Sequence, residues 1–122
     1  MANRAEAMEQ ILRSLVGSTP DLEGAAVVST DGLVLASALP AGVDEDRVSA
    51  MAAALLSLGE RTAAELTRGA LEQVYVKGNS GYVVLMRAGE ESVLEAIAGS
   101  AAKLGIVLLD MKRAAAELAK IV

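Results

Sequence analysis

The sequence predicts an α+β fold in which a five-stranded antiparallel sheet is covered by helices on both faces. The first observation is the order of the expected elements, which is helix, strand, strand, helix, three strands and helix. The second is that neighbouring strands are separated by short turns rich in Gly, Asn and Asp, which favours antiparallel pairing. The third is that both sides of the first strand pair are apolar, so each face of the sheet needs a covering layer.

The composition is that of one globular domain, residues 1–122, and it argues against several classes of function. Apolar residues make up 53% of the chain and charged residues 22%, which excludes a disordered protein. The net charge is −5 without a basic stripe, which argues against a nucleic-acid partner. The N-terminus is polar and no apolar run reaches the length of a membrane span. With no cysteine, we expect a cytoplasmic protein without membrane insertion.

The first helix is expected to begin at Asn3, whose side chain can cap the first turn together with Glu6. Its apolar residues recur on one stripe: Met8, Ile11, Leu12 and Leu15. Gly17 is expected to end this helix, because glycine readily adopts the left-handed conformation found at helix ends.

A β-hairpin is predicted around the Asp-Gly pair at positions 31 and 32, because both residue types tolerate the positive φ angles of a type I′ turn. A two-residue turn would place Val28 opposite Leu35 and Val27 opposite Ala36. Apolar side chains would then lie on both faces of the hairpin.

A long helix is predicted over Asp44–Arg68, and both of its sides are unusual. One side is a wide apolar stripe expected to face the core: Val48, Met51, Ala52, Leu55, Leu58, Thr62 and Leu66. The opposite side is small and weakly polar where a solvated helix would carry charges: Ala50, Ala53, Ala54, Ser57 and Ala64. Such a side lets another backbone come close, although alanine is also the best helix former and costs nothing on a surface.

Three strands and a helix are predicted after Gly69. The first strand has the mixed pattern of an edge strand, with four residues expected on one side: Leu71, Gln73, Tyr75 and Lys77. The second strand, 82–88, has a continuous apolar run before Arg87 and is expected inside the sheet, and the third, 92–98, has Glu95 as its one charged residue. In the last helix, 101–121, Gly105 is expected to allow close contact with a strand.

The residues offer no recognisable reaction centre, which directs the search for function towards binding. Histidine and cysteine are absent, so the commonest general bases, nucleophiles and metal ligands are missing. The acidic triplet 44–46 could suggest a metal site, but its position at a helix start is explained by the helix dipole. Ser80 and Lys77 are turn neighbours, and the chain has no phosphate-binding GxxxxGK segment. We therefore predict no catalytic residue, no metal and no cofactor, and we do not expect an enzyme.

Several strings follow one another in a specific order: LEGAAVVSTDGLVLAS, an Ala-rich helix, LEQVYVKGNSGYVVLMRAGEESVLEAIA and AAKLGIVLLDMKRAAAEL. The most specific parts are the Asp-Gly hairpin, the YVVLMRAGEE strand and turn, and the K-LG-IV-L start of the last helix. Together, over about residues 15–118, these strings resemble the Roadblock (dynein light chain) family, and within it the bacterial MglB-like branch of gliding-motility regulators.

The resemblance implies a profilin-like α/β/α arrangement, with the long helix on one face of the sheet and the first and last helices on the other. It also implies a homodimer, or a dimer with a paralogous Roadblock protein, in which third strands pair edge to edge and long helices lie together. In this chain the implied dimer interface contains the small side of the long helix and one side of the third strand: Ala50, Ala53, Ala54, Ser57, Ala64, Leu71, Gln73 and Tyr75.

Members of this family typically act as dimeric platforms for small Ras-like GTPases, and gliding-type members stimulate GTP hydrolysis. The resemblance therefore implies a GTPase regulator, with a non-catalytic adaptor in a GTPase-containing complex as the alternative. Charges at the edges and end of the long helix are expected to reach the GTPase: Glu60, Arg61, Glu65 and Arg68. Both arginines are also explained as solvated charges, and we assign no catalytic arginine. A small-molecule sensor is disfavoured, because a core of small aliphatic residues suggests no lined pocket.

Overall fold

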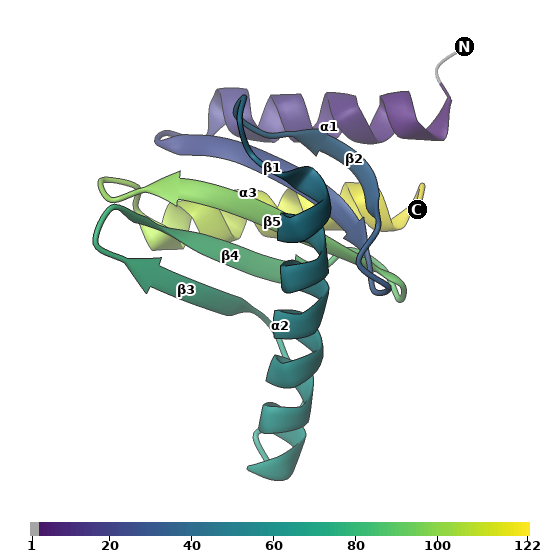
Figure 1. Cartoon of the computed structure of the whole chain (residues 1–122), viewed down its shortest axis with the longest axis vertical. Helices are drawn as coiled ribbons and strands as arrows, with labels where there is room; N and C mark the ends of the chain where they lie inside the picture. The colour runs from purple at the N-terminus through teal and green to yellow at the C-terminus, as the bar shows by residue number, and fades with distance from the viewer. Residues whose placement is uncertain (1–2) are drawn as a thin grey trace.

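The computed structural model describes residues 3–122, which form a five-stranded antiparallel sheet flanked by three helices (Figure 1). The strand order is β2-β1-β5-β4-β3. The strands are β1 (Leu22–Ser29), β2 (Val34–Ala38), β3 (Val74–Gly78), β4 (Gly81–Arg87) and β5 (Ser92–Gly99). The helices are α1 (Arg4–Ser18), α2 (Glu45–Glu65) and α3 (Leu104–Ala119). The predicted fold class is confirmed, and the first two residues of the predicted domain, 1–122, lie outside the described residues.

The two faces of the sheet are covered unequally. α1 and α3 lie on one face and α2 lies on the other, as the resemblance implied (Figure 1). The core under α1 and α3 is large and contains long side chains that are fully buried, such as Leu12, Leu94 and Met111. The cluster under α2 is small and its buried members are Ala52, Leu56, Leu85 and Val93. Far less apolar surface therefore holds α2 to the sheet.

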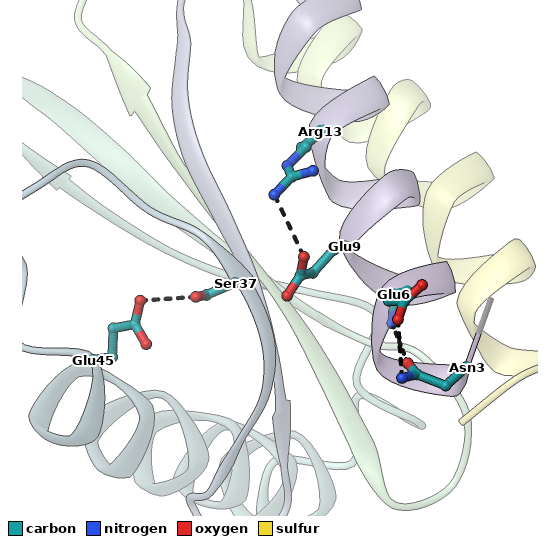
Figure 2. A network of polar contacts seen from close by, with 6 residues as sticks. All are labelled: Asn3, Glu6, Glu9, Arg13, Ser37 and Glu45. Carbon is teal, nitrogen blue, oxygen red and sulfur yellow. Dashed lines mark hydrogen bonds and ion pairs between the residues drawn. The ribbon is translucent and has the colours of Figure 1, made fainter.

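α1 begins where the sequence predicted but ends later. The backbone N–H of Glu6 donates to Asn3 Oδ1 at 2.8 Å, and Asn3 Nδ2 donates to the Glu6 carboxylate at 3.1 Å (Figure 2). The expectation that Gly17 ends the helix is wrong, because the helix passes through Gly17 and continues to Ser18. The left-handed residue that turns the chain towards β1 is Asp21, with φ 67°.

The β1–β2 connection is a three-residue loop, which corrects the predicted two-residue type I′ turn. Gly32 N–H donates to the Ser29 carbonyl at 2.9 Å, and Ser29 N–H donates to the Leu33 carbonyl at 2.8 Å. Within this loop the positive φ is confined to Gly32, at 90°, whereas a type I′ turn needs two such residues. The glycine therefore forms the bulge that follows a tighter turn.

The additional loop residue changes the strand register. Val28 pairs with Val34 and not with Leu35 as predicted, whereas the predicted pairing of Val27 with Ala36 is confirmed. The shift between these pairs is a β-bulge. β1 is buried along most of its length, in agreement with the expectation that its two faces are covered.

The later elements agree with the sequence in type and mostly in position. β3 is at a free edge of the sheet and β4 lies inside it, as predicted. β5 is the central strand, and the predicted apolar side of α3 buries Val107, Met111 and Leu118. The expectation that Gly105 makes a close contact with a strand is wrong, because a Cβ atom there would have no neighbour within 4 Å.

The start of α2 explains the acidic triplet 44–46. Asp44 caps the helix, and its Oδ1 accepts a hydrogen bond from the backbone N–H of Arg47 at 3.1 Å. Glu45 lies in the first turn, where the helix dipole favours negative charge, and its Oε2 accepts from Ser37 Oγ at 2.7 Å (Figure 2). This bond connects the first turn of α2 to β2.

The end of α2 comes before the predicted boundary. The helix ends at Glu65, three residues short of Arg68. Thr67 with φ 54° and Gly69 with φ 90° reverse the chain and lead it towards β3. Arg68 Nε donates to the Leu66 carbonyl at 2.9 Å and so satisfies one of the free carbonyl groups at this helix end.

Candidate interaction site on α2 and β3

α2 presents an apolar stripe to solvent, which contradicts its predicted orientation. The side against the sheet buries Ser49, Ala52 and Leu56. Three large side chains of the stripe expected to face the core are exposed instead: Met51 (55%), Leu58 (59%) and Leu66 (60%). The prediction that these three residues pack on the sheet is therefore wrong.

The small residues beneath α2 account for this orientation. Ser49 and Ala52 let the helix lie close to the sheet, and Leu56 packs with Leu85 and Val93. A helical wheel ranks sides by hydrophobicity, so it favours the broad Met and Leu stripe over a side of Ser, Ala and one Leu. The last turns of α2 also extend beyond the sheet, where no strand lies beneath them (Figure 1).

The small residues predicted for the dimer interface lie mostly in solvent. Ala50, Ala54, Ser57 and Ala64 are exposed, and Ala53 is half-buried. Ala50 is close to the β1–β2 loop, since a Cβ atom built on Gly32 would lie 3.2 Å from Ala50 Cα. These residues are accessible to a partner, and their place in a dimer stays a prediction.

An apolar groove, the α2–β3 groove, runs between the C-terminal half of α2 and β3. Its volume is about 490 Å³, and its walls include Leu55, Leu58, Leu66, Leu71, Val74 and Tyr75. Gly59 brings helix and strand together at the base of the groove, where a Cβ atom would lie 2.8 Å from Val74 Cγ2 and 3.3 Å from Leu71 Cδ2. The exposed stripe of α2 therefore continues into the groove.

β3 forms the outer border of this site. It pairs with β4 on one side, and on its other side no strand of the described residues pairs with it. Leu71 and Gln73 precede the strand, and the prediction that Leu71 shares a side with Tyr75 is wrong. Leu71 packs near Gly59 on the α2 side of the sheet. Tyr75 lies opposite Val84, a residue of the α1–α3 core, and it borders the groove as part of the edge strand. Alternation of sides holds only within the strand, which begins after Gln73.

A bidentate ion pair links α2 to β4. Arg87 Nε donates to Glu60 Oε2 at 2.6 Å, Arg87 Nη2 donates to Glu60 Oε1 at 2.9 Å, and Arg87 Nη1 donates to the Glu90 carbonyl. The hydrogen bond from Arg87 lowers the pKa of Glu60 and outweighs the opposing effect of burial. The sequence reasoning missed Arg87, whose one signal is a lone charge at the end of an apolar strand.

The four charges predicted to contact a GTPase do not form one cluster of free side chains. Glu60 is engaged by Arg87 within the chain. Arg61 and Glu65 are exposed on α2, and Arg68 is exposed just after the helix ends. Their contacts with a GTPase stay a prediction.

Two polar side chains are buried between α2 and the sheet without hydrogen-bond partners. Ser49 Oγ of α2 and Glu95 Oε1 of β5 are the two such atoms among the described residues. Burial raises the pKa of Glu95 to about 7. Below about pH 7, the Glu95 side chain is therefore mostly the neutral carboxylic acid.

The described residues, 3–122, contain no group of three or more acidic side chains arranged to hold a metal ion. No helix in the same part of the chain has the length and apolar character needed to cross a membrane. The features that stand out are thus the apolar stripe, the α2–β3 groove and the free edge of β3.

Comparison with known proteins identifies the family of this chain. Residues 8–98 match the model of the Roadblock/LC7 domain. The chain belongs to the Roadblock/LC7 family. This Roadblock/LC7 chain is 40% identical over 111 residues to the uncharacterized protein MJ1340 of Methanocaldococcus jannaschii, a match that covers 91% of this chain and 96% of the relative.

Solved structures show the same fold at lower identity. The gliding protein MglB from Thermus thermophilus is 22% identical with a TM-score of 0.87, covering 99% of this Roadblock/LC7 chain and 92% of that one. Profilin II of Acanthamoeba castellanii is 16% identical with a TM-score of 0.66, covering 93% and 97% respectively. The predicted Roadblock identity and the profilin-like layers are both confirmed.

Proposed function

We propose that this protein is a dimeric regulator of a small Ras-like GTPase, which it binds and whose GTP hydrolysis or nucleotide state it alters. Membership of the Roadblock/LC7 family supports this proposal. The observation that carries it is the exposed apolar stripe of α2, which continues into the α2–β3 groove. Contiguous apolar side chains on a protein surface typically mark a site of interaction with another protein.

The first partner of this surface is a second copy of the chain, or a paralogous Roadblock protein. Packing two α2 helices along Met51 and Leu58 would remove exposed apolar side chains of both copies from water. Pairing the two β3 edges would satisfy the free backbone groups of that strand. The small residues Ala54 and Ser57 are next to the stripe and would let the helices approach closely.

The GTPase contacts are assigned to Arg61, Glu65 and Arg68, which are exposed around the C-terminal end of α2. Glu60 supports this end of the helix through Arg87. That internal pairing makes Glu60 less available than the other three charges for direct contact. The second candidate is a non-catalytic adaptor that binds a GTPase without altering its hydrolysis.

A GTP-hydrolysis assay separates the two candidates. Small Ras-like GTPases from the source organism are first tested for binding to the immobilised protein. Single-turnover hydrolysis is then followed with the protein titrated to saturation, with Arg61→Ala and Arg68→Ala as variants. A regulator changes the hydrolysis or exchange rate. An unchanged rate at demonstrated saturation establishes the adaptor, and the absence of any GTPase binding overturns both.

A further inference from the structure

Glu95 is a buried carboxyl group at the centre of the sheet, on the face that α2 covers. It is 4% exposed, and β5 is the middle strand. Its cross-strand neighbours are apolar, Ala26 in β1 and Leu85 in β4. Leu85 belongs to the small cluster under α2, and residues directly opposite each other share a face of the sheet. A carboxylate is strongly disfavoured in this setting unless a partner reaches it.

The α2 side chains that cover this face bring no charge to Glu95. Ser49, Ala52 and Leu56 are buried against the sheet, and Ser49 Oγ also has no hydrogen-bond partner. The charged group of the first turn, Glu45, is bonded to Ser37 of the edge strand β2. On this side of the sheet, the polar atoms of α2 therefore leave Glu95 Oε1 without a hydrogen-bond partner.

Arg87 is the one cation in a strand beside Glu95 on this face. It lies opposite Val93, and Leu85 lies opposite Glu95, so Arg87 and Glu95 are diagonal neighbours on adjacent strands. Diagonal pairs are within reach of a long side chain. The guanidinium is instead occupied by Glu60 of α2 and by the Glu90 carbonyl. In this structure the guanidinium contacts Glu60 and the Glu90 carbonyl, and Glu95 is a second carboxyl group at a diagonal position on the neighbouring strand.

We propose that Glu95 controls how firmly α2 is seated on the sheet, by competing with Glu60 for Arg87. When the Glu95 carboxyl is neutral, Arg87 holds Glu60 and α2 lies as in this structure. When the carboxyl loses its proton, the new charge draws Arg87 away from Glu60, and the C-terminal half of α2 loosens. The raised pKa of Glu95, about 7, places this transition near neutral pH.

Only a small cluster of buried side chains holds α2 to the sheet, so α2 is the helix whose packing can change when Glu95 ionises. Its buried cluster is small, whereas α1 and α3 are held by a large core on the other face. The loosened segment carries Leu58 and borders the α2–β3 groove. A consequence for partner binding rests on the proposed function, whereas the movement of α2 is a property of the chain itself.

Hydrogen exchange of the α2 amides in the full-length protein tests the proposal without any GTPase. Exchange is measured near pH 5.5 and near pH 8.5 at one protein concentration and corrected for intrinsic rates. On raising the pH in the wild type, we expect protection of the amides around Glu60 to fall by roughly two- to fivefold more than protection of the α1 and α3 amides. Amides of α1 and α3 report the general loss of stability that ionisation of Glu95 causes, so they are the reference against which the additional loss in α2 is measured.

Three variants make the test specific. Glu95→Gln removes the titrating group and should keep α2 protected at both pH values. Glu60→Gln removes the competitor and should lower protection at both. Glu65→Gln changes an exposed glutamate of the same helix and should behave as the wild type. The proposal is overturned if Glu95→Gln retains the pH dependence of the wild type. It is equally overturned if, at both pH values, the α2 amides of Glu60→Gln are as well protected as those of the wild type at pH 5.5.

Discussion

Arg87 of β4 and Glu60 of α2 form the one ion pair between α2 and the sheet within residues 3–122, with both guanidinium–carboxylate contacts at 2.9 Å or less. The two residues are 27 positions apart in the sequence. Their side chains are 37% and 34% exposed, so water screens the pair without removing its directional hydrogen bonds.

The first prediction concerns the contribution of this pair to stability. We expect Glu60→Gln to lower the free energy of unfolding by about 0.5–1 kcal/mol, because the pair is partly solvated. Urea unfolding at neutral pH measures the change, which should shrink at high ionic strength. Glu65→Gln, on the same helix and without an ion pair in the described structure, is the matched control. Equal losses in both variants would refute a specific role for the pair.

The second prediction concerns the pH dependence of stability caused by Glu95. Its pKa is about 7 in the folded protein against an ordinary value of 4.5, because burial disfavours the charged form. Between these two values the unfolded chain loses the Glu95 proton and the folded chain keeps it, so stability falls as the pH rises. Below pH 4.5 the penalty is absent, and above about pH 7 it is complete.

Glu95→Gln removes this penalty because the amide does not ionise. We expect the variant to be more stable than the wild type near pH 8, by roughly 2–3 kcal/mol, and close to it near pH 4. Thermal and urea unfolding across this range provide the measurement. Glu91→Gln changes an exposed carboxylate before the same strand and is the control. A stability difference that does not vary with pH would contradict the assignment.

The third prediction concerns the dimer. Leu58→Glu places a charge in the exposed stripe of α2, where it would be buried without a partner in a dimer. We expect sedimentation velocity to show monomers at concentrations where the wild type is dimeric. Leu109→Glu is the matched control, because Leu109 of α3 is 50% exposed and lies on the other side of the sheet.

The same measurement distinguishes the apolar stripe from the small side of α2. Ser57→Arg and Ala53→Glu introduce large charged groups on the side that the sequence predicted to meet the partner helix. Weaker dimers in these variants as well as in Leu58→Glu indicate an interface that spans both sides. If only Leu58→Glu acts, the interface is centred on the stripe, and a dimer unaffected by all three excludes α2.

The fourth prediction uses two glycines in helices with different surroundings. Gly17→Ala should stabilise α1 by about 0.5–1 kcal/mol, because nothing lies within 4 Å of the new Cβ atom. Gly59→Ala should forfeit that gain, since its Cβ atom would lie 2.8 Å from the stiff side chain of Val74. Chemical unfolding compares the two, and a stabilising Gly59→Ala would mean that β3 moves freely away from α2.

Local signals predicted the elements well because they act over a few residues. The Asn3 cap, the edge position of β3 and the buried side of α3 all follow from nearby residues and from side-chain periodicity. The three-residue loop that contains Gly32, and the register shift between Val34 and Ala36, were missed, because an Asp-Gly pair is compatible with both two-residue and three-residue loops.

The site was predicted less well because it depends on contacts between distant segments. The orientation of α2 is set by the fit of Ser49 and Ala52 to the sheet, which a helical wheel does not contain. The pairing of Arg87 with Glu60 joins two elements whose spacing in the sequence carries no signal. The small side of α2 and the edge position of β3 were predicted from the residues, and the family resemblance combined them into an expected dimer interface.

The pairing of β1 with β5 has a consequence for how the chain folds. About half of the chain, including α2, β3 and β4, lies between the two strands at the centre of the sheet. Closing so long a loop costs entropy before the central contacts form, which makes this step a slow one. Substitutions at the β1–β5 contact should therefore retard folding, whereas those beneath α2 should chiefly accelerate unfolding.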